Sequence, residues 1–219
     1  MKYKNIFYKF VFFIIFIILF QLFDLETFET KNYNFIHIPK TAGSSISNFL
    51  KNYSNFINVQ YHDAIATKSN KPIVVIREPI DRFISMFYFF KFGHPNYSNA
   101  TIKDFIELVK NQDKGISYVI DEFHIFPQSY YLQEDVYKYT IVIKYDKERM
   151  NEKFNNLFSF LGIEPKEGVI LEKENVSKPT NEIQMDNQDK QFVYDFYKDD
   201  FILWDKIDKS PELFKKVFS

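Results

Sequence analysis

Residues 34–50 read Asn-Phe-Ile-His-Ile-Pro-Lys-Thr-Ala-Gly-Ser-Ser-Ile-Ser-Asn-Phe-Leu. This pattern predicts a short apolar strand over residues 35–38, a tight loop, and an amphipathic helix over about residues 44–51. The first N–H groups of a helix have no intrahelical partner, and the helix dipole adds partial positive charge there, so the site stabilises a phosphate or sulfate. The stretch therefore predicts an anion site, with a full charge from Lys40 and hydroxyl donors from Thr41, Ser44 and Ser45.

The order of lysine and glycine in this loop differs from that of a Walker A loop. In Gly-x-x-x-x-Gly-Lys-[Ser/Thr] the lysine follows the last glycine and stands at the helix start. Here Lys40 precedes Gly43. This order disfavours a nucleoside triphosphate as the ligand.

Strand-like and helix-like segments alternate along the rest of the chain. Further strands are predicted at 59–61, 72–76 and 139–144, and helices at 80–91, 101–110, 127–134, 147–161 and 188–204. Such alternation is typical of an α/β fold with a mostly parallel sheet flanked by helices. Ligands of these sheets bind beyond the carboxyl ends of the strands, where both Lys40 and Arg77 are placed by the prediction.

Two of the three arginines in the chain, Arg77 and Arg82, fall within one six-residue stretch, although lysines number 25. Arginine binds a phosphate through a planar fork that lysine lacks. Arg77 follows the strand predicted at 72–76, and Ser85 lies about two helical turns further along. Arg77 and Ser85 therefore indicate a second anion site. For Arg82, pairing with a surface carboxylate such as Asp81 is an equal alternative.

Two stretches resemble motifs of one enzyme family, the Golgi-type membrane-bound carbohydrate sulfotransferases. Residues 35–46 resemble its 5′-phosphosulfate loop, and residues 75–85, Val-Ile-Arg-Glu-Pro-Ile-Asp-Arg-Phe-Ile-Ser, resemble its 3′-phosphate motif. Glu78 stands where that family usually carries Asp. Weaker similarity continues through residues 124–128, 143–146 and 197–201. The relatives are of the sulfotransferase family 2 kind, including heparan and dermatan uronyl 2-O-type enzymes.

The resemblance implies a P-loop-like α/β fold of the nucleotide-kinase and sulfotransferase type. It implies 3′-phosphoadenosine 5′-phosphosulfate as the donor, with no metal, and a glycan or proteoglycan as the acceptor. Arg77 and Ser85 would contact the 3′-phosphate, and a late loop with Ser177 and Lys178 would close over the nucleotide. The contacts on the 5′ side would come from Lys40, Thr41, Ala42, Gly43, Ser44 and Ser45.

The proposed reaction also needs a charge stabiliser and a base. Lys40 would neutralise the charge that grows on the bridging oxygen of the leaving nucleotide. His62 lies where the uronyl 2-O-type relatives place a catalytic histidine, and Asp63 is a candidate to orient it. A solvated loop role is the alternative for His62, and His37 is expected to be packed inside the first strand. Other candidates are His124 as a base or acceptor contact, Arg82 as an acceptor contact, and Glu122 or Glu134 as a base.

The N-terminus predicts a membrane anchor. Residues 10–20 form an unbroken apolar run that basic residues precede and acidic residues follow, which places the N-terminus in the cytoplasm. We predict a cytoplasmic tip and signal-anchor helix over 1–23, a stalk over 24–33 and a sulfotransferase domain over 34–219, facing the Golgi lumen as a type II membrane protein. A buried amphipathic helix is the alternative, because the run is short for a span. Glycosylation sequons stand at Asn52, Asn96, Asn99 and Asn175.

Composition excludes several other classes of function. The chain has no cysteine, so disulfides and a thiol nucleophile are ruled out, and its four histidines lack metal-motif spacing. A net charge of −1 provides no basic field for nucleic acid. Two alternatives to a sulfotransferase stay open at this point, an inactive relative that binds glycans or acts as a scaffold, and a P-loop-like kinase.

Overall fold

A parallel sheet of five strands, in the order β2-β1-β3-β4-β5, forms the centre of the fold. The computed structural model describes residues 33–93, 95–111, 122–172, 183 and 185–219. Every strand pair in the sheet is parallel, as predicted. The strands are β1 (Tyr33–Ile36), β2 (Ile57–Gln60), β3 (Pro72–Ile76), β4 (Ile141–Lys144) and β5 (Lys216–Phe218).

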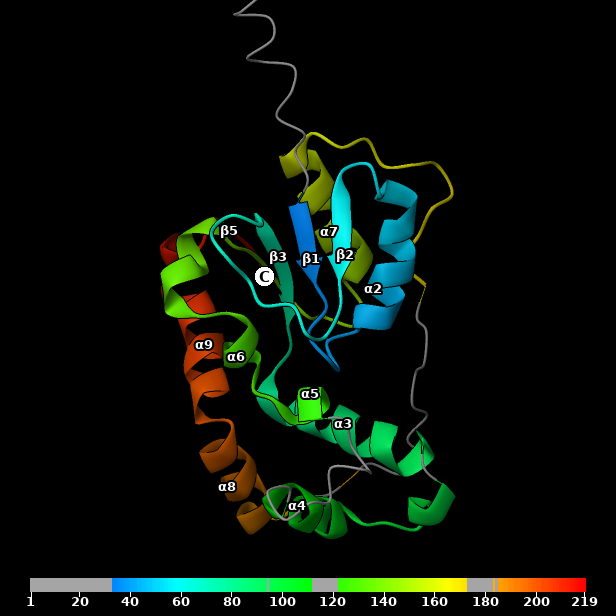
Figure 1. Ribbon diagram of the computed structural model, residues 1–219, viewed down its shortest axis with the longest axis vertical. Coiled ribbons are helices and arrows are strands. Elements are labelled where there is room, and N and C mark those ends of the chain that lie inside the picture. Colours follow the sequence, from blue (N-terminus) through cyan, green and yellow to red (C-terminus); the bar gives the residue numbers. More distant parts are fainter. Residues whose placement is uncertain (1–32, 94, 112–121, 173–182, 184) are drawn as a thin grey trace, which may run out of the picture. The chain divides into compact units, whose positions relative to one another are not determined.

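Helices cover both faces of the sheet (Figure 1). Strands β3 and β4 are buried along their whole length, as expected for runs of branched apolar residues in the middle of a parallel sheet. Successive side chains point to opposite faces, so Val75 packs toward α2 (Gly43–Leu50) and α7 (Met150–Leu161). Val74 packs on the other face, toward α6 (Gln128–Tyr131) and α9 (Lys198–Lys209).

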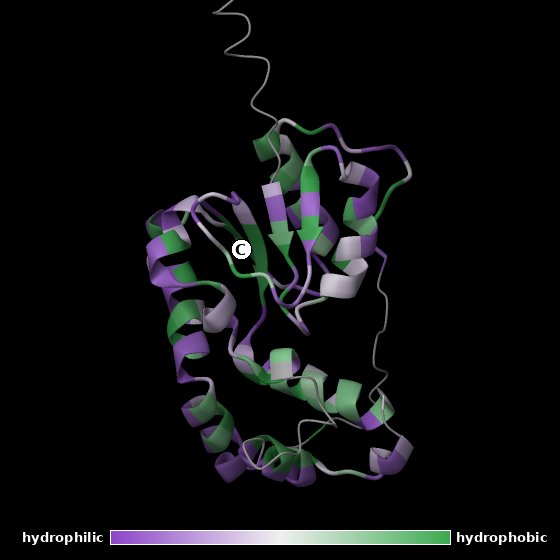
Figure 2. Ribbon diagram, in the orientation of Figure 1, coloured by the Kyte–Doolittle hydropathy of each residue, from purple (hydrophilic) through white to green (hydrophobic). Residues whose placement is uncertain are grey.

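A second group of helices packs around its own apolar core, beyond the carboxyl ends of β1 and β3 (Figures 1 and 2). It consists of α3 (Pro79–Gly93), α4 (Ile102–Lys110) and α8 (Asn187–Phe196), and Phe83, Phe105 and Val193 lie at its centre. The short helix α5 (Glu122–Ile125) lies against α3. Because α3 starts directly after β3, this group places several side chains above the sheet edge at which ligands bind in α/β folds. Four 3₁₀ turns complete the described elements, at Lys51–Tyr53, Pro95–Tyr97, Glu134–Tyr139 and Pro211–Leu213.

Several predicted boundaries are confirmed. The strand at 72–76 is found as predicted, and Thr101 caps α4 with a reciprocal capping box to Asp104. Helix α7 ends at Gly162, which has a φ of 68°, a conformation that glycine adopts at little cost.

Other predicted elements are wrong in detail. The helix predicted at 188–204 is two helices, α8 and α9, which meet at Tyr197. The helix predicted at 127–134 is only one turn, α6, followed after Gln133 by a 3₁₀ turn. The strand predicted at 35–38 starts two residues earlier, so Tyr33 belongs to β1 rather than to a stalk. Strand β5 was not predicted.

The predicted anchor over residues 1–23 and the predicted stalk up to residue 32 lie outside the described residues. Within the described ranges, none of the helices combines the length and apolar character needed to cross a bilayer.

Candidate active site

The loop between β1 and α2 has an unusual backbone. Lys40 and Ala42 both lie in the left-handed region, with φ of 66° and 69°, which residues other than glycine seldom occupy. Ala42 is the N-cap of α2 and supplies no side-chain cap to the first N–H groups of the helix. Backbone strain of this kind gathers at ligand sites. The predicted anion site at this loop thus lies on a strained backbone at the start of a helix.

Gly43 allows the start of α2 to lie tightly against His37, the residue that follows β1. A Cβ atom built at this position would stand 1.7 Å from Cδ2 of His37, far inside van der Waals contact. Thr41 also serves the loop itself, because its buried hydroxyl donates to the carbonyl of Ile38 at 2.9 Å. The predicted hydroxyl contact from Thr41 to the donor is therefore replaced by an internal bond, whereas the exposed side chain of Ser44 remains placed at the helix start.

Arg77 joins the two predicted anion sites. Its Nη1 donates to the backbone carbonyl of Lys40 at 3.1 Å, since β1 and β3 are neighbours in the sheet. Its Nε donates to Asp81 at 2.7 Å, and its guanidinium carbon lies 4.6 Å from the ring centroid of Tyr145. The structure places no hydrogen bond between Arg77 and Ser85, which is half-buried on α3.

Gln128 fixes the backbone of Arg77. Its side-chain oxygen accepts from the N–H of Arg77 at 2.8 Å, and its side-chain nitrogen donates to the carbonyl of Arg77 at 2.8 Å. Gln128 is fully buried, and its own N–H donates to Asp200 at 2.9 Å. The end of β3 is therefore held by the first residue of α6, 51 positions further along the chain.

Arg82 has a structural role. Its side chain is 1% exposed; Nε donates to the carbonyl of Pro39 at 3.0 Å and Nη2 donates to the carbonyls of His124 and Phe126 at 3.3 and 2.9 Å. Nη1 lies 3.7 Å from the buried carboxylate of Asp200. A side chain so enclosed presents no surface to an acceptor. We therefore withdraw the prediction that Arg82 contacts the acceptor, and equally the alternative that it pairs with a surface carboxylate.

The ammonium group of Lys40 lies over an aromatic ring. Its Nζ is 4.1 Å from the ring centroid of Phe89 on α3, a cation–π contact. Burial, followed by the positive charges of Arg77 and Arg82, lowers the pKa of Lys40 to about 8. The site therefore holds a cation that lacks a carboxylate partner among the described residues, and an anionic ligand would supply one.

Three of the four histidines form a continuous series of ring contacts beside Lys40. The ring centroids of His37 and His62 are 4.6 Å apart, and those of His62 and His124 are 5.1 Å apart. His124 in turn stacks on Phe89 at 4.8 Å with an interplanar angle of 7°. The predicted base His62, the alternative base His124 and the predicted charge stabiliser Lys40 thus meet at one site. They come from the loop after β2, from α5 and from the loop after β1.

His37 is buried, as expected, but it belongs to this cluster. Burial, and then the charges that His62, His124 and Lys40 would carry, lower its pKa to about 4. Its Nδ1 is buried and makes no hydrogen bond within the described residues. A neutral His37 therefore forms the inner wall of the site and separates the loop from His62.

The other predicted residues lie as follows. Ser45 is buried in the first turn of α2, and Asp63 is exposed beside His62. Glu134 forms an ion pair with Lys206 on α9. Ser177, Lys178 and the side chain of Glu122 lie outside the described residues. No group of three or more His, Asp and Glu side chains in the described part of the chain is arranged to hold a metal ion.

Sequence reasoning missed three residues that build the site: Phe89, Gln128 and Asp200. Phe89 is one of many aromatic residues on α3, and only its exposed fraction of 43% separates it from the core residues around it. Gln128 and Asp200 lie in the two weakly similar stretches, 124–128 and 197–201, but nothing in those stretches pointed to burial or to Arg77 and Arg82. A buried polar residue is identified by its partners, and those partners are distant in sequence.

Comparison with known proteins agrees with this geometry. Searches of curated proteins and of solved structures returned no match to the chain. A family model described as the sulfotransferase family matches residues 19–206, which include the Lys40 loop, Arg77 and all three clustered histidines. The chain belongs to the sulfotransferase family.

Proposed function

We propose that this protein transfers a sulfuryl group from 3′-phosphoadenosine 5′-phosphosulfate to a hydroxyl group of a carbohydrate. Family membership supports sulfuryl transfer in general. One observation carries the choice of donor: Arg77 donates to the carbonyl of Lys40, so two cationic sites lie side by side at the carboxyl ends of β1 and β3. A nucleotide with phosphate groups at both its 3′ and 5′ positions matches two adjacent sites of this kind, whereas a nucleoside triphosphate lacks the 3′ group.

The residues divide the chemistry as follows. The N–H groups at the start of α2, with the Ser44 hydroxyl, bind the 5′-phosphate of the donor. The Arg77 fork binds the 3′-phosphate, with Gln128 holding it in place. The ammonium of Lys40 lies near the sulfate and stabilises negative charge on the bridging oxygen.

The reaction is a single displacement. The acceptor oxygen forms a bond to sulfur while the bond from sulfur to the bridging oxygen of the donor breaks, and the nucleotide leaves as the 3′,5′-bisphosphate. The hydroxyl proton passes to a ring nitrogen of His62, which stands between His37 and His124. His124, stacked on Phe89, supports the acceptor side of the cluster.

An exposed aromatic face supports a saccharide as the acceptor. Tyr61 is 56% exposed, and its ring lies 6.0 Å from that of His37. Flat apolar faces around a polar centre bind the C–H faces of sugar rings, while the polar centre binds their hydroxyl groups.

We further propose that the protein faces the Golgi lumen and is held in the membrane by residues 1–23. The apolar run within that segment and the charges on either side of it support this topology. The sequon residues Asn52, Asn96 and Asn99 are all exposed, which leaves them accessible to lumenal glycosylation.

A transfer assay tests the proposal. The full-length chain in detergent is incubated with sulfur-labelled donor and a panel of uronic-acid, galactosamine and glucosamine oligosaccharides. We expect label on at least one acceptor. We expect a loss of about 10²- to 10³-fold for Lys40→Ala, since it removes a charge stabiliser, and a loss of about 10²- to 10⁴-fold for His62→Ala, since it removes a base. Lys190→Ala, an exposed lysine on α8, is the matched control.

Two results would contradict the proposal. Binding of the 3′,5′-bisphosphate without transfer to any acceptor would indicate an inactive relative. Thermal stabilisation by ATP with magnesium but not by the bisphosphate would indicate a kinase. Retained activity in His62→Ala would remove only the assignment of the base.

A further inference from the structure

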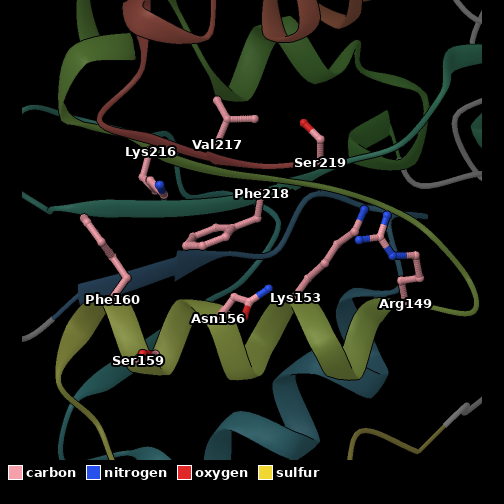
Figure 3. A pocket seen from close by; sticks show the side chains of 9 residues that line it. All are labelled: Arg149, Lys153, Asn156, Ser159, Phe160, Lys216, Val217, Phe218 and Ser219. Carbon is pink, nitrogen blue, oxygen red and sulfur yellow. The ribbon is translucent and has the colours of Figure 1, made fainter.

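A surface groove lies between α7 and β5, apart from the residues of the candidate active site. Its volume is about 490 Å³, within the range of small-ligand sites. Figure 3 shows Arg149 and Lys153 at one end of the groove, and Phe160 and Lys216 at the other. Its lining residues are Arg149, Lys153, Asn156, Ser159, Phe160, Lys216, Val217, Phe218 and Ser219.

The side chains that line the groove are cationic or neutral. Three of them, Arg149, Lys153 and Lys216, carry positive charge, and none is Asp or Glu. Arg149 makes an exposed ion pair with Glu152 one turn along α7, at 2.9 Å. Exposed pairs of this kind are weak, so a bound anion can compete for Arg149. The lining side chains thus carry net positive charge, which favours an anionic ligand.

Lys153 is a buried cation among the residues that line the groove. It is 3% exposed, and its Nζ donates to the carbonyl of Lys144 at 2.9 Å. No carboxylate lies within ion-pair distance of it among the described residues, and burial lowers its pKa. Buried charges are usually paired, because an unpaired one loses its hydration without compensation. An anionic group in the groove would supply the counter-charge.

The opposite end of the groove offers aromatic surface. The rings of Phe160 and Phe218 meet edge to face, with centroids 6.3 Å apart, and Phe160 is 45% exposed. The ammonium of Lys216 lies 5.9 Å from the Phe160 ring and 5.7 Å from the Phe218 ring. Between the two ends lie the side chains of Asn156 and Ser159, which offer an amide and a hydroxyl. Anion-binding, hydrogen-bonding and ring-binding side chains thus follow one another along the groove.

We propose that the groove between α7 and β5 binds an anionic saccharide, one that carries sulfate or carboxylate groups, as a second glycan site. The acidic groups bind Arg149, Lys153 and Lys216, a sugar face lies on Phe160, and ring hydroxyl groups bind Asn156 and Ser159. This inference rests on the proposed function, because a glycan sulfotransferase meets such chains as substrate and as product.

The groove adjoins the candidate active site along the sheet. Lys153 is bonded to the last residue of β4, and the next residue, Tyr145, carries the Arg77 guanidinium over its ring. Strand β5 is three positions from β1 in the sheet, which corresponds to about 14 Å at the usual spacing of strands. A saccharide chain a few residues long therefore spans from the groove to the edge where Lys40 lies.

Calorimetric titration tests this site without depending on catalysis. A sulfated tetrasaccharide is titrated into the full-length Lys40→Ala protein in detergent, saturated with the 3′,5′-bisphosphate so that the donor site is filled. We expect the added changes Lys216→Gln and Phe160→Ala each to weaken binding about tenfold. The matched controls are Lys190→Gln and Phe56→Ala, an exposed lysine and an exposed phenylalanine outside the groove. Both should leave the affinity unchanged.

Several outcomes would overturn the groove assignment. The first is that Lys216→Gln and Phe160→Ala both leave the affinity for the sulfated tetrasaccharide unchanged. The second is that the unsulfated tetrasaccharide binds with equal affinity. The third is that inorganic sulfate competes fully with the tetrasaccharide while Phe160→Ala has no effect. If the groove variants bind the 3′,5′-bisphosphate more weakly, the groove would instead be part of the donor-binding site. Loss of sulfuryl transfer to every acceptor leaves this titration unaffected, so failure of the proposed function and failure of the groove are distinguished.

Discussion

The side-chain amide of Gln128 makes both of its hydrogen bonds to the backbone of Arg77, one to its N–H and one to its carbonyl, each at 2.8 Å. The amide thereby replaces a strand partner at the point where β3 ends and the chain turns into α3. Gln128 thus positions Arg77 through its backbone, and it is not itself proposed to contact the donor.

Gln128→Leu should lower both stability and donor affinity. The change leaves the half-buried N–H and carbonyl of Arg77 without these partners, which costs at most about 1–3 kcal/mol for each group. We expect a lower urea midpoint and about tenfold weaker binding of the 3′,5′-bisphosphate. Gln133→Leu, at an exposed position after α6, is the control. Normal bisphosphate affinity in a folded Gln128→Leu protein would show that Gln128 does not position Arg77.

Asp200→Asn should destabilise the fold. The Asp200 carboxylate is fully buried, accepts from the N–H groups of Gln128 and Ser129, and lies 3.7 Å from Arg82. Neutralising it leaves the buried charge of Arg82 unpaired, which costs on the order of 3–5 kcal/mol. Urea unfolding followed by circular dichroism measures the loss. Asp199→Asn, its exposed neighbour on α9, should change stability little, and equal effects of the two substitutions would refute the buried pairing.

Gly43→Ala should disturb the loop through His37. The new methyl group would overlap the imidazole, and relieving such an overlap costs about 1–3 kcal/mol. Gly93→Ala is the matched control, because nothing lies within 4 Å of a Cβ atom there. In a double-mutant cycle with His37→Ala, the smaller side chain should remove part of the cost of Gly43→Ala. Additive effects would indicate that the two residues do not interfere.

The pH dependence of donor binding should report the environment of Lys40. Its pKa lies at about 8, so the ammonium charge is complete well below pH 8 and is lost as the pH rises through that value. We expect the affinity for the 3′,5′-bisphosphate, measured by calorimetry from pH 6.5 to 9.5, to fall above pH 8. The Lys40→Met protein should bind more weakly and show no such fall. Constant affinity up to pH 9.5 in the parent protein would place the pKa of Lys40 at its ordinary value.

Local patterns in the sequence predicted the elements that local chemistry determines. The buried strand β3 follows from four branched apolar residues after Pro72, and the start of α4 follows from Thr101 and Asp104. The loop with Lys40 could be predicted because helix N-termini bind anions in any fold. The break at Tyr197 could not, because its phenol donates to the carbonyl of Ile125, 72 residues away, and that contact is visible only in three dimensions.

The role of a site residue could likewise be predicted where it depends on neighbours in the sequence, and not where it depends on distant segments. Arg77 was identified because it follows a strand, but Arg82 was misread because its four partners are backbone carbonyls and Asp200 in distant segments. Strand β5 has only three residues and a lysine at its start, too short for a periodic signal, and pairing with β4 determines it. His37 was expected to be packed, which is correct, but its contact with His62 depends on the pairing of β1 with β2.

The bond from Arg77 to the carbonyl of Lys40 also constrains how this protein can vary. The two residues are 37 positions apart and belong to different motifs, yet a shift of either backbone lengthens the same hydrogen bond. A natural substitution that moves the start of α3 therefore requires a matching change in the loop before α2. We therefore expect substitutions in the two motifs to occur together among related chains.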